Sequence, residues 1–165
     1  MSDHFLIMGV SGTGKTTIGQ KLAEALGCAF EDADAYHPPA NVSKMKEGIP
    51  LNDADRAAWL EQLNRMLRER DQQGVPVVLA CSALKQKYRD VLKQGLDSLS
   101  VVFLSGSHEL LAGRIRQRSD HFMPAALLDS QLADLEIPRN ALRIDVSFPP
   151  EEIVRKISNH FEPKA

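Results

Sequence analysis

A glycine-rich segment near the N-terminus constrains the fold more than any other feature. Residues Gly9 to Thr16 fit the pattern G-x-x-x-x-G-K-[ST]. They follow the short apolar run Phe5 to Met8 and open a helical pattern of apolar residues from Ile18 to Leu26. A strand that turns through glycines into a helix is the context that this pattern requires. The chain is therefore predicted to begin with a strand, a loop and a helix.

The loop predicts an anion-binding site. Glycines let successive backbone N–H groups approach phosphate oxygens, and the following helix adds the positive end of its dipole. We expect Lys15 to reach the β- and γ-phosphates of ATP, and the Thr16 hydroxyl to bind the Mg²⁺ that bridges them. Thr17 is expected to add an α-phosphate contact. The predicted nucleotide-binding residues of the loop are Gly9, Ser11, Gly12, Thr13, Gly14, Lys15, Thr16 and Thr17.

Apolar runs and helical patterns alternate along the rest of the chain. Buried strands are predicted at Phe5 to Met8, Ala29 to Glu31, Val75 to Ala80, Val101 to Leu104 and Arg143 to Val146. Helices are predicted at Ile18 to Leu26, Trp59 to Leu67, Leu84 to Lys93, Glu109 to Arg118 and Ile153 to Phe161. This alternation is typical of a parallel sheet with helices on both faces. We predict an α/β fold in three layers, α/β/α, with a mainly parallel sheet and a single domain over residues 1–165.

Composition excludes several classes of protein. The 165 residues, of which 43% are hydrophobic and 25% charged, are typical of a globular domain. A formal net charge of -2 argues against a nucleic-acid partner, which normally requires a basic surface. Cys28 and Cys81 form no metal motif, and the apolar stretch near the N-terminus is too short for a signal or spanning helix. We expect a cytoplasmic protein without membrane contact.

The metal-binding carboxylate is predicted beside the second strand. In switch-type phosphate-loop proteins an Asp that ends a later strand holds Mg²⁺, but here those strands run into Cys81-Ser82 and Ser105-Gly106. Asp32 and Asp34 follow the second strand, and in extended chain both project to one side. Asp32 is assigned to Mg²⁺ or to the proton of an attacking hydroxyl, and Asp34 to the acceptor's hydroxyls. The two roles can be exchanged.

Two pairs of basic residues stand four apart. Lys85 and Arg89 share one face of a predicted helix and are assigned to a carboxylate or phosphate on the acceptor. Arg114 and Arg118 precede a predicted mobile lid at about residues 119–126. Arg114 is assigned to the nucleotide and Arg118 to the charge on the transferring phosphate, where a closing arginine contributes roughly 4 to 7 kcal/mol. The predicted catalytic residues are Lys15, Asp32, Asp34 and Arg118.

These residues predict a kinase that transfers the γ-phosphate of ATP to a hydroxyl of a small anionic acceptor. A nucleotide-dependent switch is the alternative from another class, since Asp71 to Gly74 is similar to a GTPase switch motif. That segment precedes a strand, however, and the chain has no NKxD motif for guanine, so we interpret it as a turn. Shikimate and nucleotides stay open as acceptors.

The motifs resemble those of the bacterial gluconate kinases, in the shikimate-kinase-like group of P-loop kinases. The matching segments are Gly9 to Thr16, Asp34 to Pro38, Lys44-Met45, Gly48 to Arg56, Trp59-Leu60, Cys81 to Lys85, Tyr88 to Asp90, Arg114, Arg118, His121 to Pro124, Leu127-Leu128, Ser130-Gln131, Leu135-Glu136 and Pro138. The resemblance implies ATP- and Mg²⁺-dependent phosphorylation of D-gluconate at its 6-hydroxyl, giving 6-phosphogluconate for sugar-acid catabolism, often by a homodimer.

Gluconate suits the predicted acceptor residues. Its carboxylate is expected at Lys85 or Arg89, and its hydroxyls at Asp34, His37 and Asn41. One departure concerns the lid, where the family commonly has Lys-Gly before His-Phe and this chain has Ser119-Asp120.

Overall fold

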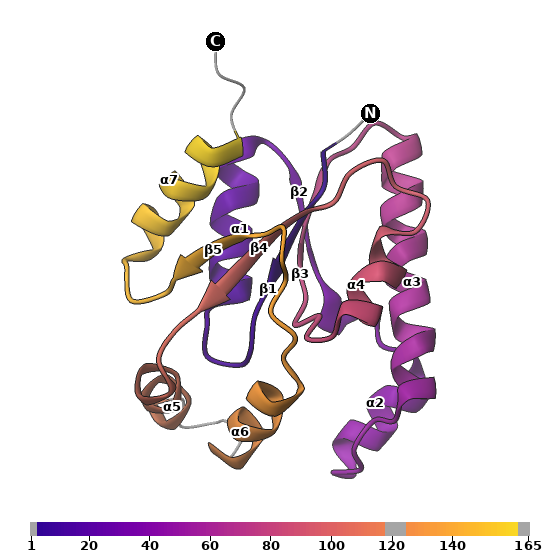
Figure 1. Cartoon of the computed structure of the whole chain (residues 1–165). Coiled ribbons are helices and arrows are strands. Elements are labelled where there is room, and N and C mark those ends of the chain that lie inside the picture. Colours follow the sequence, from indigo (N-terminus) through magenta and orange to yellow (C-terminus); the bar gives the residue numbers. More distant parts are fainter. Residues whose placement is uncertain (1–2, 118–124, 162–165) are drawn as a thin grey trace.

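One parallel sheet organises the computed structural model, which describes residues 3–117 and 125–161 (Figure 1). Within those residues, five strands pair in the order β2-β3-β1-β4-β5, and each neighbouring pair is parallel. The strands are β1 Phe5–Met8, β2 Ala29–Asp32, β3 Val77–Ala80, β4 Ser100–Ser105 and β5 Leu142–Asp145. All of them therefore end at the same edge, toward the bottom of Figure 1.

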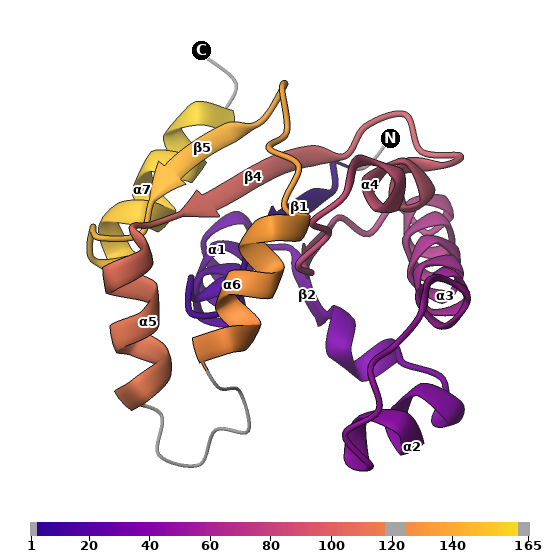
Figure 2. The same cartoon turned by 60° about the horizontal axis from the view of Figure 1, so that its bottom comes forward.

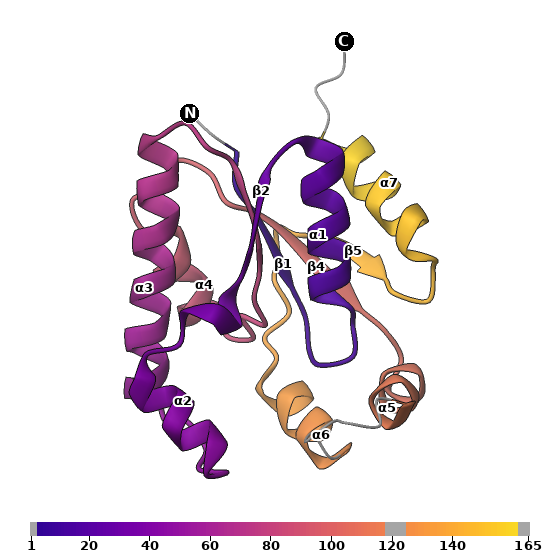
Figure 3. The ribbon, with the colours of Figure 1, turned by 180° about the vertical axis from the view of Figure 1, so that it is seen from behind.

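Helices cover both faces of the sheet, which confirms the predicted α/β class and its three layers. Helices α1 and α7 lie on one face and α3 and α4 on the other, as Figures 1 and 3 show from opposite sides. Helices α2, α5 and α6 lie beyond the carboxyl ends of the strands. The bounds are α1 Lys15–Leu26, α2 Pro39–Lys46, α3 Asp53–Gln72, α4 Gln86–Lys93, α5 His108–Gln117, α6 Ala125–Asp134 and α7 Pro150–Phe161, with the 3₁₀ helix η1 at Ala33–Tyr36.

The central strand β1 connects two apolar cores. Phe5 and Ile7 pack with α1, α5 and α7 on one face, whereas Leu6 and Met8 pack with α3 and α4 on the other. Burial of one such side chain contributes roughly 1.5 to 3 kcal/mol relative to exposure. A strand buried on both faces shows a continuous apolar run, which is why β1 was predicted with its observed bounds.

Three local predictions differ from the structure. The segment after β2 is not extended, because Ala33–Tyr36 forms a 3₁₀ helix and the Asp32 side chain accepts a hydrogen bond from the Asp34 N–H at 3.0 Å. Helix α2, which the sequence interpretation did not predict, begins at Pro39, where the missing N–H does no harm. Helix α7 begins at Pro150, three residues before its predicted start at Ile153.

Helix α6 lies between α5 and α2 at the carboxyl edge of the sheet (Figure 2). The predicted lid covers residues 119–126, of which 119–124 lie outside the described residues. Arg118, predicted to be catalytic, also lies outside them. In the parts of the chain that the structure describes, no helix has the length and apolar character needed to cross a membrane.

Candidate active site

The glycine-rich loop turns tightly between β1 and α1. Gly9 has a φ of 155°, and a Cβ atom there would stand 2.7 Å from the Leu104 carbonyl oxygen. Gly14, with a φ of 87°, is the N-cap of α1. The Thr13 hydroxyl donates to the Val10 carbonyl at 2.8 Å and is buried. A hydrogen bond within the loop thus stabilises its conformation, and the N-terminus of α1 faces the carboxyl edge of the sheet.

Thr16 and Asp32 meet across the start of α1 and the end of β2. The Thr16 hydroxyl donates to Asp32 Oδ2 at 3.0 Å, and Lys15 Nζ donates to the Val10 carbonyl at 3.2 Å. A hydroxyl and a carboxylate are oxygen ligands of the kind that Mg²⁺ prefers, and this ion is usually held by one or two carboxylates together with substrate phosphates. The residues predicted for the metal therefore fit it.

A cavity of about 290 Å³, called here the phosphate cavity, joins the loop to the two carboxylates. Its walls include Lys15, Thr16, Asp32 and Asp34, so the predicted catalytic residues that the structure describes share one space. Reduced hydration raises the pKa of the Asp34 carboxyl above 3.8, and the nearby Asp32 charge raises it further, while His37 and Lys15 partly oppose this. Such a shifted carboxyl is a candidate general base.

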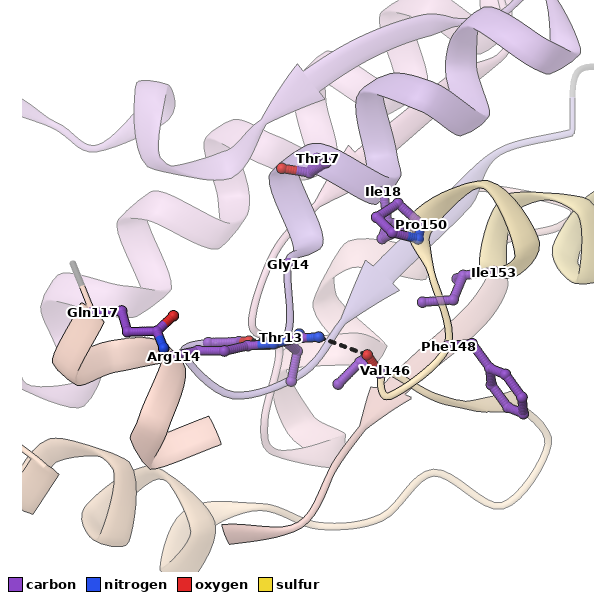
Figure 4. Close-up of a pocket in the computed structure, with 11 residues that line it drawn as sticks. Thr13, Gly14, Thr17, Ile18, Arg114, Gln117, Val146, Phe148, Pro150 and Ile153 are labelled. Atoms are coloured by element: carbon purple, nitrogen blue, oxygen red, sulfur yellow. Dashed lines mark hydrogen bonds between the residues drawn. The ribbon is translucent and has the colours of Figure 1, made fainter. Parts of the chain in front are cut away.

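A second cavity, of about 320 Å³, shares Gly12, Gly14 and Thr17 with the phosphate cavity and is called the Arg114 cavity (Figure 4). Arg114 donates to the Gly12 carbonyl at 3.2 Å and to the Val146 carbonyl at 2.7 Å. The wall is completed by apolar side chains from the start of α7 and the segment before it, among them Phe148 and Ile153. A flat cation beside apolar surface suits a nucleotide base.

A third cavity, of about 140 Å³, is called the Trp59 cavity. It shares Ser82 and Gln131 with the phosphate cavity, so the two spaces adjoin. Arg56 and Tyr88 also line it, and Arg56 Nη1 donates to the Tyr88 hydroxyl at 3.4 Å. A cation and several polar groups beside the phosphate cavity suit a small anionic acceptor.

His37 and Asn41 lie next to Trp59. The rings of His37 and Trp59 stack with centroids 4.3 Å apart, and Trp59 Nε1 donates to the Ala33 carbonyl at 2.8 Å. Reduced hydration lowers the pKa of His37, which favours the neutral ring. The Asn41 side chain is 2% exposed and donates to the Asp55 carbonyl at 3.0 Å. The acceptor contacts of His37 and Asn41 stay predictions, and the geometry gives Asn41 a supporting part.

Lys85 and Arg89 do not share an exposed face. Lys85 is the N-cap of α4, whereas Arg89 is 4% exposed and points inward. The Arg89 guanidinium donates to the carbonyls of Ala83 at 2.7 Å and Glu136 at 2.8 Å. Arg89 lines neither the phosphate cavity nor the Trp59 cavity. Its predicted acceptor contact stays a prediction, while the structure favours a role in holding the backbone that leads into α4.

The sequence interpretation assigned no role to Arg56, Ser82 or Gln131. All three lie in segments that carried the family resemblance, but their spacing gives no sign of a shared site. They come together only because α3, the end of β3 and α6 meet at the carboxyl edge.

Comparison with known proteins gives a consistent result. The shikimate kinase family model matches residues 11–158. A gluconokinase of Gluconobacter oxydans is 46% identical over 95% of this chain and 90% of its own length. The thermosensitive gluconokinase of Escherichia coli is 42% identical over 88% of this chain and 80% of its own.

A solved structure extends the comparison to the fold. The gluconokinase of Sinorhizobium meliloti superposes with a TM-score of 0.83 at 47% identity and covers 93% of this chain and 88% of its own. The family match thus includes Ser11 to Thr16 of the phosphate loop, the residues that line the Arg114 and Trp59 cavities, and α6. The chain belongs to the shikimate kinase family and, within it, to the gluconokinases.

Proposed function

We propose that this chain transfers the γ-phosphate of ATP to the 6-hydroxyl of D-gluconate. The observation that carries the proposal is that the phosphate cavity adjoins the Trp59 cavity through Ser82 and Gln131. A nucleotide phosphate in the first space and a hydroxylated anion in the second are neighbours, as in-line transfer requires. The named relatives select gluconate among such anions.

The loop and Arg114 supply the nucleotide site. Backbone N–H groups from Gly12 to Thr16 and the N-terminus of α1 suit the phosphates, and the Arg114 cavity suits the base. Thr16 and Asp32 would hold Mg²⁺, which supplies charge neutralisation at the phosphates when bound. Arg118 stays a predicted contact of the transferring phosphate.

Asp34 and Arg56 supply the acceptor side. Asp34 would take the proton of the gluconate 6-hydroxyl. The hydroxyl oxygen would then bond to the γ-phosphorus, while the bond between that phosphorus and the bridging oxygen of ADP breaks. Arg56, which is partly exposed and lines the Trp59 cavity, is the cation that we assign to the gluconate carboxylate. Lys85 is the second candidate for the gluconate carboxylate, since its Nζ lies 6.0 Å from the centroid of the Tyr88 ring, and Tyr88 lines the Trp59 cavity.

A coupled assay tests the proposal. Purified chain with ATP, Mg²⁺ and D-gluconate is expected to release ADP at a rate that depends on gluconate concentration. A panel that includes shikimate and nucleoside monophosphates is expected to rank gluconate first by kcat/KM, because specificity is that ratio. Release of ADP at the same rate without acceptor would instead support a nucleotide switch.

Substitution of Lys15 tests the phosphate contact. Lys15→Ala is expected to lower kcat by about 10²- to 10³-fold, the usual effect of removing one group that stabilises the transition-state charge. Lys21→Ala is the matched control, since Lys21 lies on the same helix in an exposed ion pair with Glu151 at 3.4 Å. Equal kcat values for the two variants would contradict the assignment of Lys15.

We also propose a homodimer in the cytoplasm. Both cysteines, Cys28 and Cys81, are free thiols, which supports a reducing compartment. The dimer rests on the family resemblance alone, and light scattering in solution would detect a mass of two chains.

A further inference from the structure

Gln131 occupies a position between the two substrate cavities. Its side-chain oxygen Oε1 accepts a hydrogen bond from the Ser11 backbone N–H at 2.7 Å. Among the residues that the structure describes, Gln131 and Ser82 line both the phosphate cavity and the Trp59 cavity. A residue of α6 therefore contacts the phosphate loop directly across the junction.

The chain just after α6 is tied to the N-terminus of α4. The Glu136 N–H donates to the Leu84 carbonyl at 2.8 Å, and the Glu136 carboxylate accepts from the Gln86 N–H at 2.7 Å. Arg89 donates to the Glu136 carbonyl at 2.8 Å. Three contacts thus anchor the C-terminal side of α6 to the segment that forms one wall of the Trp59 cavity. The chain that leads out of the helix carrying Gln131 therefore contacts that wall directly.

The Ser11 N–H is also a natural partner for a phosphate oxygen, because it belongs to the loop that wraps the phosphates. An N–H group directs one strong hydrogen bond, so the Gln131 oxygen and a phosphate oxygen compete for it. Both are acceptors, and their close approach is repulsive. Once displaced, the Gln131 amide still has two N–H donors, which can face a phosphate or an acceptor hydroxyl.

We propose that Gln131 is a positioning residue that couples nucleotide binding to the acceptor site: a phosphate of ATP displaces its oxygen from Ser11, and the released amide turns toward the Trp59 cavity. The inference rests on the proposed function, because it assumes a phosphorylated nucleotide in the loop. It predicts that the two substrates bind with positive coupling, so that each tightens the other by the same factor.

Two substitutions at Gln131 are expected to change nucleotide affinity in opposite directions. Gln131→Met keeps the length but removes the competing oxygen, so Mg²⁺–AMPPNP is expected to bind about two- to tenfold more tightly, the range of one net hydrogen bond. Gln131→Glu places a charged acceptor at Ser11, and affinity is expected to fall at least about tenfold. Calorimetry without gluconate measures both. Asp129→Asn, on the exposed face of α6, is the matched control and is expected to bind as the wild type.

The coupling itself is measured by titrating gluconate with and without Mg²⁺–AMPPNP. The nucleotide is expected to tighten gluconate binding in the wild type and to lose most of that effect in Gln131→Met. Weaker nucleotide binding by Gln131→Met, or an unchanged coupling factor, would overturn the inference. If Gln131→Met does not fold, as judged by its thermal unfolding, Gln131→Glu and the shorter Gln131→Asn decide, since Asn should behave as Met does.

The two proposals fail separately. A wild type that phosphorylates gluconate but shows no opposed shifts keeps the function and loses the inference. If the two Gln131 variants change nucleotide affinity in opposite directions but gluconate is not phosphorylated, the displacement at Ser11 is supported and gluconate is excluded as the acceptor.

Discussion

At the scale of residues, the candidate site has two carboxylates, Asp32 at the end of β2 and Asp34 in the 3₁₀ helix that follows, which differ in environment. Asp32 is tied to the Thr16 hydroxyl and to the Asp34 N–H, which fits a metal ligand. Asp34 carries a raised pKa because its hydration is reduced and Asp32 is close. A carboxyl with a raised pKa is suited to the role of general base. The structure thus favours Asp34 as the base, a choice that the sequence left open.

Substitution of Asp34 is expected to separate activity from stability. Asp34→Asn should lower kcat by about 10²- to 10⁴-fold if Asp34 is the base. Because the pKa of Asp34 is raised in the fold, its ionised form at neutral pH destabilises the native state, and the Asn variant should unfold at equal or higher urea concentration. Activity and urea unfolding of the same preparations check both.

The pH profile gives a further test at this residue. In the wild type kcat/KM should fall as the pH falls through the raised pKa of Asp34, since the protonated carboxyl cannot accept a proton. Asp34→Glu should keep an acidic limb, and Asp34→Asn should lose it. A limb that persists in the Asn variant would move the base to another group.

At the scale of elements, the helix α4 is held at both ends by residues from elsewhere in the chain. Glu136 caps its N-terminus, and the buried Asn64 of α3 donates to the carbonyls of Leu92 and Gln94 at 2.9 and 2.8 Å at its C-terminus. The last carbonyls of a helix have no partner within it. An eight-residue helix is too short to be stable alone, so these contacts fix its position.

Asn64→Ala is expected to lower the free energy of unfolding by about 1 to 3 kcal/mol, because two carbonyls lose their donor. Urea unfolding measures the loss, and Glu61→Ala on the exposed side of α3 is the control. Activity of the folded Asn64→Ala protein should change little, since Asn64 lines none of the three cavities of the site. A loss confined to activity would contradict this structural role.

The elements that the sequence predicted well are those with long apolar signals. Strand β1 has its predicted bounds, whereas β3 begins at Val77 rather than Val75. The physical reason is that the Val75 N–H bonds to the Arg70 carbonyl and Pro76 has no N–H for the ladder. The sequence interpretation missed helix α2, which begins at a proline, and it missed helix α6. The role of α6 could not be predicted because it depends on contacts between residues distant in sequence, such as that of Gln131 with Ser11.

At the scale of the whole molecule, His4, the residue before β1, connects β3 with α3. Its ring is fully buried, Nδ1 accepts from the Val77 N–H of β3 at 3.2 Å, and Nε2 lies 3.1 Å from the Asp71 carboxylate of α3. The acceptor role of Nδ1 places the ring hydrogen on Nε2, which donates to Asp71. The segment Asp71 to Gly74, which is similar to a switch motif in sequence, is thus part of this structural link.

His4→Phe is expected to lower the free energy of unfolding by about 1 to 3 kcal/mol, because it fills the space but leaves the buried Val77 N–H without its acceptor. Asp71→Asn should cost less, since the amide oxygen can still accept from Nε2. Chemical unfolding of both variants gives the comparison. Equal losses would place the stabilisation at the Asp71 contact instead.

Trp59, which stacks on His37, provides an intrinsic fluorescence signal for ligand binding. Trp59 is the single tryptophan of the chain, and it lines the cavity assigned to the acceptor but not the Arg114 cavity. Intrinsic tryptophan fluorescence therefore reports on the acceptor cavity. A change in tryptophan fluorescence on addition of gluconate, with little direct response to the base of the nucleotide, would allow acceptor arrival to be timed without any attached dye.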